Sequence, residues 1–324
     1  MKTRVAVVYG GRSGEHEISL RSAKSIIEGL DPERYHVIHY FIAKDGRWRP
    51  KPIAPEPGAN REIDVVFPAL HGTFGEDGTM QGLFELADLP YVGPGVLGSA
   101  VAMDKEVTKR LLKQSGVPVT DYVVQYRGAL NPDAITLPFP LFVKPANLGS
   151  SVGITKVKTR EQLGPALENA AQYDTKVIIE RGIVGREFEI AVLGNQEDRR
   201  ASFPCEIRPK REFYDYEAKY IEDSTEIDLP ANLPPDKIAE MQRLAVAACA
   251  ALELEGMTRC DFLMDSATGE LFLNEPNTIP GFTSISMFPK MWEHAGIPFA
   301  ELLDHLIALA LRRHERKRAT RFEK

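Results

Sequence analysis

Apolar runs and helical periodicity alternate along the first part of the chain. Strand-like apolar runs occupy residues 5–9, 35–42, 64–70 and 90–93, and helix-like spacing occupies 19–30 and 80–88. The first run is mostly β-branched and ends in a glycine-rich turn, so it predicts a strand, a loop and a helix in succession. This alternation predicts a parallel, doubly wound α/β sheet within residues 1–98.

A second pattern covers residues 99–185, where short strands surround one helix. Thr159 and Gln162 form a capping box at the start of that helix. The other expected elements are a helix at 99–114 and strands at 141–144, 154–157 and 177–180. We therefore expect a small central unit of the α+β class.

The remaining residues, 186–324, predict a larger α+β unit. Its expected elements are strands at 188–193 and 201–207, a helix at 236–255, a hairpin at 258–276, a long loop, and a helix at 299–318. Between them lies a polar segment, 208–226, with no clear period. A segment of that length inside a compact enzyme is usually a functional lid, and we expect a lid here.

Composition and charge narrow the class of protein. The 324 residues include 46 acidic and 40 basic ones, for a net charge of −6, which argues against a nucleic-acid partner. The longest apolar run, 244–252, is far shorter than the ~20 residues that span a bilayer, and the N-terminus lacks a signal-peptide pattern. The three cysteines are too far apart for a zinc knuckle or a disulfide framework. We expect a cytoplasmic protein without membrane contact.

One glycine motif suggests another class of protein. Residues 93–98 match the G-x-G-x-x-G spacing of a dinucleotide-binding turn. They follow the fourth predicted strand instead of the first, Pro94 stiffens the turn, and no acidic residue closes a strand of the expected kind. An NAD-dependent dehydrogenase is therefore the weaker alternative. The first glycine turn, 10–14, lacks the Lys-Ser/Thr ending of a P-loop.

The segment after Lys144 predicts a phosphate-binding loop. A strand ends at Lys144, and the Gly/Ser-rich residues 149–153 then lead into a second strand. Such a turn presents backbone N–H groups and hydroxyls to a polyanion, with a cation beside it. Taken alone, the segment is equally consistent with a flexible hairpin that carries a surface lysine.

The predicted C-terminal hairpin carries the most specific pattern. If its turn is a three-residue loop that ends at Gly269, Asp261 faces Glu275 and Arg259 faces Asn277. Alternation then puts these four side chains on one face. Two carboxylates and an amide oxygen form a site suited to Mg²⁺, and the arginine adds a donor for a developing oxyanion.

The alternative interpretation of this hairpin face is a solvated polar strand. Opposed acids repel without a cation, and Leu263 and Leu273 are expected to continue the same face into apolar packing. Pro276 cannot donate a ladder hydrogen bond, so we expect its strand to be an edge strand or to be bulged there.

Three further polar residues lie near predicted strand ends. Glu180 ends one strand and Glu187 follows after a short connection. Both could accept hydrogen bonds from an adenine amine and ribose hydroxyls, although a surface ion pair is an equally common role. His71 is either a substrate contact or, as a lone histidine more often is, structural.

Taken in order, these motifs resemble the D-alanine-D-alanine ligase family of the ATP-grasp superfamily. The resemblance rests on blocks at residues 10–19, 71–78, 103–105, 144–145, 149–153, 180, 185–187, 213–220, 259–261 and 274–283. It implies an ATP-grasp fold of three domains: an N-terminal substrate-binding α/β domain (1–98), a central lid domain (99–185) and a C-terminal catalytic α+β domain (186–324) with the lid loop 208–226. ATP would lie between the last two.

The resemblance also implies a reaction. ATP would phosphorylate the carboxylate of a first D-alanine, and the amine of a second D-alanine would attack this D-alanyl phosphate to give D-alanyl-D-alanine, ADP and phosphate for peptidoglycan synthesis. Two Mg²⁺ (or Mn²⁺) ions would neutralise phosphoryl oxygens, and the family usually forms homodimers. Ligases that make D-alanyl-D-serine or D-alanyl-D-lactate are alternatives, as is a catalytically idle nucleotide-binding module.

Residue by residue, the resemblance implies three groups. The catalytic group, which would bind D-alanine and stabilise the oxyanion, is Glu15, Ser150, Tyr220, Arg259, Gly281 and Ser286. The group that would hold ATP is Lys105, Lys144, Ser151, Glu180, Ile183, Glu187, Phe213 and Lys219. The metal ligands would be Asp261, Glu275 and Asn277.

Within the catalytic group, Glu15 would pair with the ammonium of the first substrate, and Ser150 would link it to Tyr220 in the lid. Arg259 and the Gly281 N–H would form the oxyanion hole. An intact Glu-Ala-Lys-Tyr block that ends at Tyr220 argues for an amine as the second nucleophile.

Overall fold

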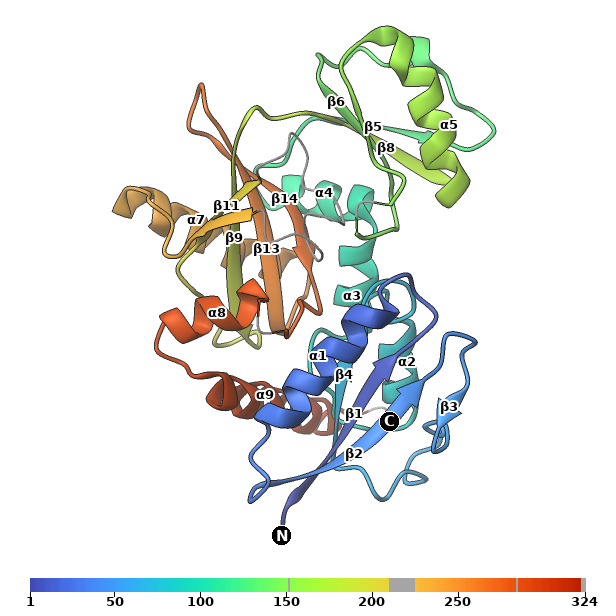
Figure 1. The fold of residues 1–324 in the computed structure, drawn as a ribbon, viewed down its shortest axis with the longest axis vertical. Coiled ribbons are helices and arrows are strands. Elements are labelled where there is room, and N and C mark those ends of the chain that lie inside the picture. The colour runs from blue at the N-terminus through green and yellow to red at the C-terminus, as the bar shows by residue number, and fades with distance from the viewer. Residues whose placement is uncertain (151, 210–224, 284, 322–324) are drawn as a thin grey trace.

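The chain folds around three separate β-sheets. The computed structural model describes residues 1–150, 152–209, 225–283 and 285–321. Within these residues the sheets follow one another along the long axis of the molecule, with helices packed on and between them (Figure 1). This mixture of one mainly parallel and two antiparallel sheets agrees with the predicted fold class.

The first sheet is mainly parallel. Its strands are β1 (Thr3–Gly10), β2 (Tyr35–Ile42), β3 (Trp48–Arg49) and β4 (Val65–Ala69), in the order β3-β2-β1-β4. β1 pairs in parallel with β2 and β4, and helices α1 (His16–Gly29) and α2 (Thr79–Leu86) complete the predicted α/β pattern. The strand predicted at 90–93 is wrong. Tyr91 forms a single bridge with Val66, because Pro90 lacks an N–H and Gly93 turns the chain with a φ of 93°.

The helix predicted at 99–114 is two helices. α3 (Val96–Met103) and α4 (Lys105–Gln114) are separated by Asp104, whose extended backbone ends the first helix. The Asp104 side chain accepts hydrogen bonds from the N–H groups of Glu106 and Val107, both at 3.1 Å, and so caps α4. The apolar periodicity hides this break because a capping residue adds no apolar position.

The second sheet is small and antiparallel. Its strands are β5 (Tyr122–Tyr126), β6 (Leu141–Pro145), β7 (Thr155–Val157) and β8 (Lys176–Arg181), in the order β5-β8-β6-β7. Helix α5 (Leu163–Tyr173) packs on it, and the 3₁₀ turn before α5 carries the predicted capping box of Thr159 and Gln162. A buried cluster that includes Val143, Leu167 and Ile179 joins the helix to the sheet.

The third sheet is the largest and is also antiparallel. Its strands are β9 (Gly185–Gly194), β10 (Arg200–Ala201), β11 (Cys205–Pro209), β12 (Thr225–Asp228), β13 (Gly256–Asp265) and β14 (Leu271–Asn277). The order is β12-β11-β9-β13-β14, with β10 on β9, so β14 is an edge strand. Helix α7 (Pro235–Ala251) packs on one face. The end of the predicted lid, 225–226, belongs to β12, and 210–224 lie outside the described residues.

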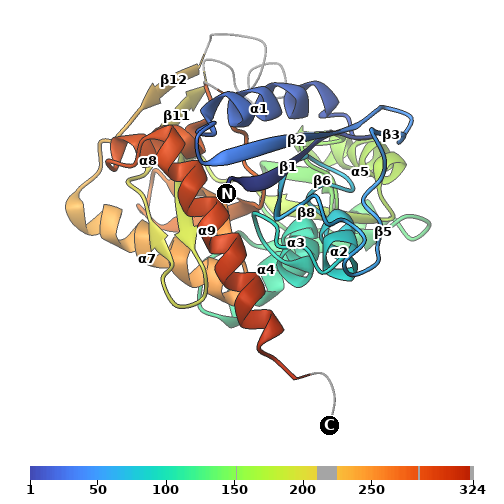
Figure 2. The same ribbon diagram turned by 90° about the horizontal axis from the view of Figure 1, so that it is seen from below.

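The loop predicted before the last helix contains another helix, α8 (Met287–His294). Pro289 lies in the first turn of α8, where it indicates a loop in the sequence pattern but costs no helical hydrogen bond. The final helix, α9, covers Phe299–Arg318 as predicted and returns to the first sheet (Figure 2). Leu302 and Leu306 of α9 share one buried cluster with Val5 and Phe67 of that sheet. The C-terminal helices therefore fix the first sheet against the third.

Two helices placed in the central unit by the predicted domain boundaries pack elsewhere. Ala102 of α3 and Leu112 of α4 are buried in the cluster beneath the third sheet, together with Leu244 of α7. The division at residues 98 and 185 remains a prediction. What the packing shows is that α4 is anchored to the third sheet's unit while it lies beside the second sheet (Figure 1).

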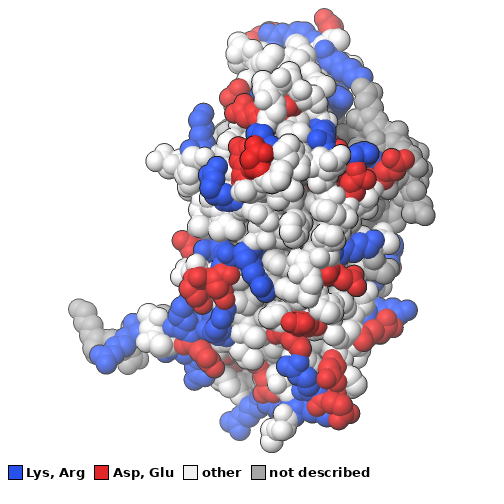
Figure 3. All heavy atoms as spheres, turned by 90° about the vertical axis from the view of Figure 1, so that its left-hand side faces the viewer, with Lys and Arg blue, Asp and Glu red and all other residues white. Residues whose placement is uncertain are grey.

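The basic end of α9 is neutralised by acids of other elements. Arg312 pairs with Asp198, and Lys317 pairs with Glu85. On the face shown in Figure 3, basic and acidic side chains are interspersed, with no extended patch of one sign. The excess of basic residues at the chain end is therefore matched by ion pairs. No single helix among the described residues is long and apolar enough to cross a membrane, and only the bent pair α8 and α9 passes that test together.

Candidate active site

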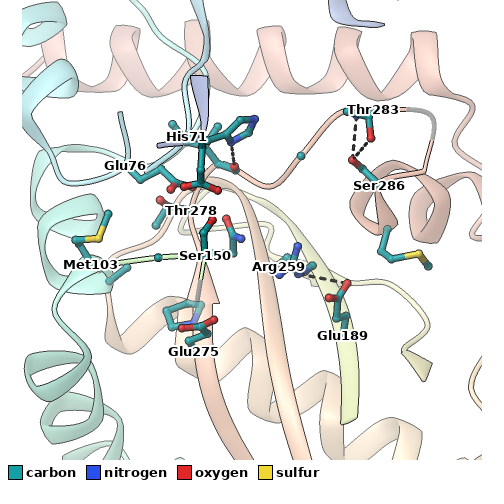
Figure 4. A pocket seen from close by; sticks show the side chains of 18 of the residues that line it. His71, Glu76, Met103, Ser150, Glu189, Arg259, Glu275, Thr278, Thr283 and Ser286 are labelled. Atoms are coloured by element: carbon teal, nitrogen blue, oxygen red, sulfur yellow. Dashed lines mark hydrogen bonds and ion pairs between the residues drawn. The ribbon is translucent and has the colours of Figure 1, made fainter. Parts of the chain in front are cut away.

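Two cavities meet at the third sheet. One, of about 250 Å³, lies between loops of the first sheet's unit and the ends of β13 and β14 (Figure 4). The other, of about 500 Å³, lies between the second and third sheets. Glu189 on β9 and Glu275 on β14 line both cavities. We call them the amino-acid cavity and the nucleotide cavity, after the substrates that the sequence resemblance implies.

The hairpin of β13 and β14 places the predicted oxygen ligands as expected. Asp261 pairs with Glu275, and Arg259 pairs with Asn277. Near the turn the register differs by one residue from the expected one, and a β-bulge that leaves Asn274 unpaired in the ladder restores it. The predicted register is therefore right at the site but wrong at the turn.

The bulge also changes which residues share a face. Leu273 pairs with Phe262, and both are buried in the apolar cluster on the α7 side of the sheet. The expectation that Leu273 continues the carboxylate face is wrong, because the extra residue reverses the alternation. The expectation for Pro276 is confirmed, since its strand is an edge strand with a bulge close by.

One of the predicted oxygen ligands is buried without a hydrogen-bond partner among the described residues, which favours a bound cation. The Asn277 Oδ1 atom is buried and has no hydrogen-bond partner among the described residues, which is costly unless a ligand or ion contacts it. Asp261 is held by Arg259 through two contacts of 2.7 Å. The described residues bring no three His, Cys, Asp or Glu side chains together as a metal cluster. A cation here would therefore need further oxygens, such as those of phosphates.

Two buried lysines, one on the wall of the nucleotide cavity and one behind that wall, contact the same carboxylate. Glu180 on β8 is 3% exposed; its Oε2 lies 2.9 Å from the Lys144 Nζ, and its Oε1 lies 3.4 Å from the Lys109 Nζ. Burial alone would raise the pKa of Glu180, but the two lysines lower it below the ordinary value. Glu180 is therefore an ionised carboxylate, and a contact with adenine remains a prediction.

Of the other predicted nucleotide ligands, some lie within the described residues and some do not. Lys105 contacts the Leu148 carbonyl at 2.6 Å and lies 3.7 Å from Glu275, while Ile183 and Glu187 line the nucleotide cavity. Ser151, Phe213 and Lys219, together with the catalytic candidate Tyr220, lie outside the described residues.

The predicted phosphate loop folds tightly against β6. At Gly153 the φ is 73°, and a Cβ there would lie 2.9 Å from Pro145, so a larger residue would force the loop away. Ser150 also has a left-handed backbone, with a φ of 52°. Gly149 approaches Glu15, whose Oε2 lies 3.7 Å from the position of a Cβ. The loop therefore reaches from the second sheet to the amino-acid cavity.

The first sheet contributes three titratable side chains to the amino-acid cavity: Glu15, His71 and Glu76. His71 is buried, with Nε2 2.9 Å from the Ser22 hydroxyl and Nδ1 3.0 Å from the Ile279 carbonyl. Burial lowers the pKa of His71. This histidine is thus a neutral connection between the first sheet's unit and the loop after β14, which agrees with the structural role considered for it.

Glu76 is a residue of this cavity that we did not select from the sequence. Its Oε2 accepts a hydrogen bond from the Gly72 N–H at 2.6 Å. Burial, followed by the charge of Glu15, raises the pKa of Glu76 to about 8. At neutral pH it is therefore mainly protonated. Its position in the 71–78 block is the only sequence signal for it.

Gly281 and Ser286 meet on the opposite wall of the amino-acid cavity. The Ser286 hydroxyl lies 2.8 Å from the Thr283 hydroxyl and accepts from the Thr283 N–H at 3.0 Å (Figure 4). A Cβ at position 281 would lie 2.7 Å from the Ser286 Oγ, so this close approach requires glycine. Arg259 lies on the same wall, 3.3 Å from Glu189.

Two residues of the site were missed because they depend on pairing between distant elements. Glu189 faces the same side of the sheet as Asp261, its ladder partner on β13. Lys109 lies one helical turn after Lys105, a spacing that puts both on one side of α4.

The glycine motif at 93–98, which suggested a dinucleotide-binding turn, has a packing role in the structure: a Cβ at Gly98 would lie 2.7 Å from the Glu253 carbonyl.

The fold and the paired cavities define an ATP-grasp ligase. A cavity between two antiparallel sheets, with the buried Lys144 on its wall, shares Glu189 and Glu275 with a second cavity that also has an arginine. Family models described as "D-ala D-ala ligase C-terminus" and "D-ala D-ala ligase N-terminus" match residues 111–308 and residues 4–59 and 53–94. The chain belongs to the D-alanine-D-alanine ligase family, as the sequence motifs indicated.

Named relatives and solved structures agree with this assignment. The chain is 62% identical over 324 residues, 99% of each protein, to a D-alanine-D-alanine ligase of Solibacter usitatus, strain Ellin6076. It is similar to the D-alanine-D-alanine ligase structure from Coxiella burnetii, with a TM-score of 0.86 and 37% identity over 98% of this chain and 96% of that one. It is also similar to the VanG D-Ala:D-Ser ligase of Enterococcus faecalis, with a TM-score of 0.87 and 35% identity over 96% and 100%.

Proposed function

We propose that this protein joins two D-alanines at the expense of ATP, giving D-alanyl-D-alanine, ADP and phosphate for peptidoglycan synthesis. The observation that carries the proposal is the meeting of the two cavities at Glu275, beside Arg259. A phosphate held in the nucleotide cavity would reach a carboxylate in the amino-acid cavity there, so the phosphoryl group would have a short path between the two substrates.

The first step is phosphoryl transfer to the first D-alanine. Its carboxylate oxygen attacks the γ-phosphorus, and the bond to the bridging oxygen of ADP breaks. Lys105 and Lys144 hold the phosphates, while Glu15 accepts hydrogen bonds from the substrate ammonium. The protonated Glu76 adds no second negative charge beside Glu15, so the cavity suits a zwitterion with a single ammonium.

Asp261, Glu275 and Asn277 are the residues that would hold two Mg²⁺ (or Mn²⁺) ions. The orphaned Asn277 Oδ1 supports this use of the site. When bound, such ions neutralise the phosphate oxygens during transfer. Arg259 keeps Asp261 in place through its two contacts, so the arginine orients a ligand of the cation site.

The second step joins the amino acids. The amine of the second D-alanine attacks the carbonyl carbon of the D-alanyl phosphate, phosphate leaves, and the amine loses a proton. Arg259 and the Gly281 N–H would donate hydrogen bonds to the oxygen that becomes negative. Ser286, with Lys219 from outside the described residues, would address the carboxylate of the second substrate or the transferred phosphate.

The test is phosphate release by the purified protein with ATP, Mg²⁺ and D-alanine. We expect release that depends on D-alanine, with one D-alanyl-D-alanine formed per phosphate. Omission of D-alanine is the control. If no phosphate appears above that control, the proposal is wrong. Omission of Mg²⁺ and titration with Mn²⁺ test the cation site separately.

A D-alanyl-D-serine ligase is the second candidate, because the VanG D-Ala:D-Ser ligase covers 96% of this chain at 35% identity. Competition between D-alanine, D-serine and D-lactate as second substrates would separate the products. The proposed enzyme should give mainly D-alanyl-D-alanine. Tyr220→Phe should loosen the lid and admit D-lactate, and an unchanged product ratio would argue against that role for Tyr220.

The setting of the enzyme remains part of the proposal. We propose a cytoplasmic homodimer that has no nucleic-acid or membrane partner. Light scattering on the purified protein gives its mass in solution, and a mass near the 36.1 kDa of one chain would contradict the dimer. Fractionation of cells that express the protein tests its location.

A further inference from the structure

Lys109 on α4 is a buried cation outside the residues that line the two cavities. Its side chain is 1% exposed, and its Nζ donates a hydrogen bond to the Thr120 hydroxyl at 3.0 Å. The same Nζ lies 3.4 Å from the Oε1 of Glu180, whose Oε2 contacts Lys144 at 2.9 Å. Glu180 therefore lies between two lysines, one at the cavity wall and one behind it.

A lysine in that position does not touch the nucleotide. Glu180 and Lys144 line the nucleotide cavity, and Lys109 does not. Burying an ammonium is costly unless it is paired. Burial lowers the pKa of Lys109 and the charge of Glu180 opposes that shift, so its positive charge depends on the contact with Glu180. Its effect on the reaction has to pass through that carboxylate.

Lys109 changes the charge that the Lys144–Glu180 pair presents to a phosphate. A neutral pair offers a phosphate no net positive charge, and a Lys144 that turned toward a phosphate would leave a buried carboxylate unpaired. Removing one partner of a buried ion pair is strongly destabilising. With Lys109 on the other oxygen, Glu180 stays paired and Lys144 is available to the phosphate.

We propose that Lys109 is a positioning residue for ATP: it neutralises Glu180 so that Lys144 can bind a phosphate. The inference rests on the proposed function, because it assumes ATP in the nucleotide cavity. It differs from a purely structural role in one consequence. Loss of Lys109 should affect ATP more than D-alanine, since the amino-acid cavity contains neither lysine.

The chain offers a matched control in Lys176. Its Nζ on β8 contacts Asp104 at 2.6 Å and Glu106 at 3.2 Å, so it joins β8 to the start of α4. Lys109 joins the same two elements in the opposite direction, from α4 to Glu180 on β8. Lys176→Met therefore removes an ion-pair connection between these elements without touching Glu180 or Lys144.

The experiment compares Lys109→Met, Lys109→Arg and Lys176→Met with the unaltered protein by steady-state kinetics and thermal unfolding. For Lys109→Met we expect the KM for ATP to rise roughly tenfold or more, as loss of about 1.4 kcal/mol of binding would give, with the KM for D-alanine changed much less. Lys109→Arg should restore most of the ATP affinity, and Lys176→Met should leave both KM values near normal.

A double variant gives a second readout of the proposal. Lys109→Met/Glu180→Gln also removes the carboxylate that competes with phosphate for Lys144, so it should recover part of the ATP affinity relative to Lys109→Met alone. Equal changes in both KM values, the same ATP defect in Lys176→Met, or an unchanged KM for ATP in Lys109→Met would each overturn the role. If the unaltered protein does not release phosphate, the proposed function has failed. If the unaltered protein is active but ATP affinity falls only in Lys176→Met, the proposed role of Lys109 is wrong and the proposed function stands.

Discussion

The two cavities bury ionisable groups to opposite effect. In the nucleotide cavity, Glu180 stays ionised because lysines contact both of its oxygens, and its pKa is lowered despite burial. In the amino-acid cavity, Glu76 accepts a hydrogen bond from the neutral backbone N–H of Gly72. Burial, followed by the charge of Glu15, raises its pKa to about 8. Burial thus leaves Glu180 charged in one cavity and Glu76 mainly neutral in the other.

The difference corresponds to what each cavity has to bind. A polyphosphate needs an excess of positive charge that is available without leaving buried carboxylates unpaired. A zwitterionic amino acid needs an anion for its ammonium, which Glu15 would supply, and a neutral Glu76 adds no second carboxylate charge that would repel the charge of Glu15. Glu189 and Glu275 line both cavities, and in the proposed reaction the phosphoryl group would pass between the cavities there.

The largest expected effect comes from the residue at the boundary. Glu275→Gln keeps the size of the side chain but removes a charge that a cation between the cavities requires. The activation barrier should rise by about 4 kcal/mol, so turnover should fall on the order of a thousandfold. Phosphate release at saturating Mg²⁺ measures it. Glu270→Gln, at the exposed turn of the same hairpin, is the control and should be nearly normal. Activity close to normal in Glu275→Gln would refute the cation site.

The next comparison removes one carboxylate from each cavity. Glu180→Gln leaves two buried lysines without their counter-ion and should destabilise the protein by roughly 3 kcal/mol. Glu76→Gln keeps a neutral side chain in the folded state, so it should not destabilise the protein and should raise its stability at pH 7, because folding no longer requires the uptake of a proton. Thermal unfolding at pH 7 measures both. Equal losses would show that the two carboxylates do not differ in charge state.

A smaller effect should appear in the pH dependence of stability, with opposite sign in the two cavities. Glu76 has a raised pKa of about 8, so its contribution is complete below the unfolded value of 4.5 and declines as pH rises to about 8. Glu180 has a lowered pKa, so its contribution is present above 4.5 and is lost toward lower pH. Unfolding midpoints across this range should fall less steeply with rising pH in Glu76→Gln. A slope unchanged from the unaltered protein would contradict the raised pKa.

The sequence predicted the parts of the fold that depend on local patterns. The first parallel sheet, the capping box at Thr159 and the final helix follow from apolar spacing and capping chemistry. The break at Asp104 was missed because a helix that stops and restarts keeps its apolar period. Helix α8 was missed because Pro289 indicates a break in the sequence pattern, although a proline in the first turn of a helix costs no helical hydrogen bond.

The candidate site was predictable where a single hairpin determines it. Asp261, Glu275 and Asn277 share a face because of strand alternation alone, although the bulge at Asn274 was needed to keep them in register. The charge states were not predictable, because they depend on neighbours from distant elements. Glu180 meets Lys109 from α4, and nothing in the sequence near either residue indicates that contact.

We expect the smallest effect from removing a hydroxyl group that would bind the second D-alanine in the amino-acid cavity. The Ser286 hydroxyl is held by Thr283 on the cavity wall, close to Gly281. Ser286→Ala should raise the KM for the second D-alanine by roughly tenfold, since one hydrogen bond to a charged group contributes about 1.5 kcal/mol, and should leave the KM for ATP near normal. Thr283→Val, which removes only the supporting hydroxyl, should show a weaker defect of the same kind. A defect in ATP binding as large as that in D-alanine binding would mean that the two cavities are not separate in the way their buried charges indicate.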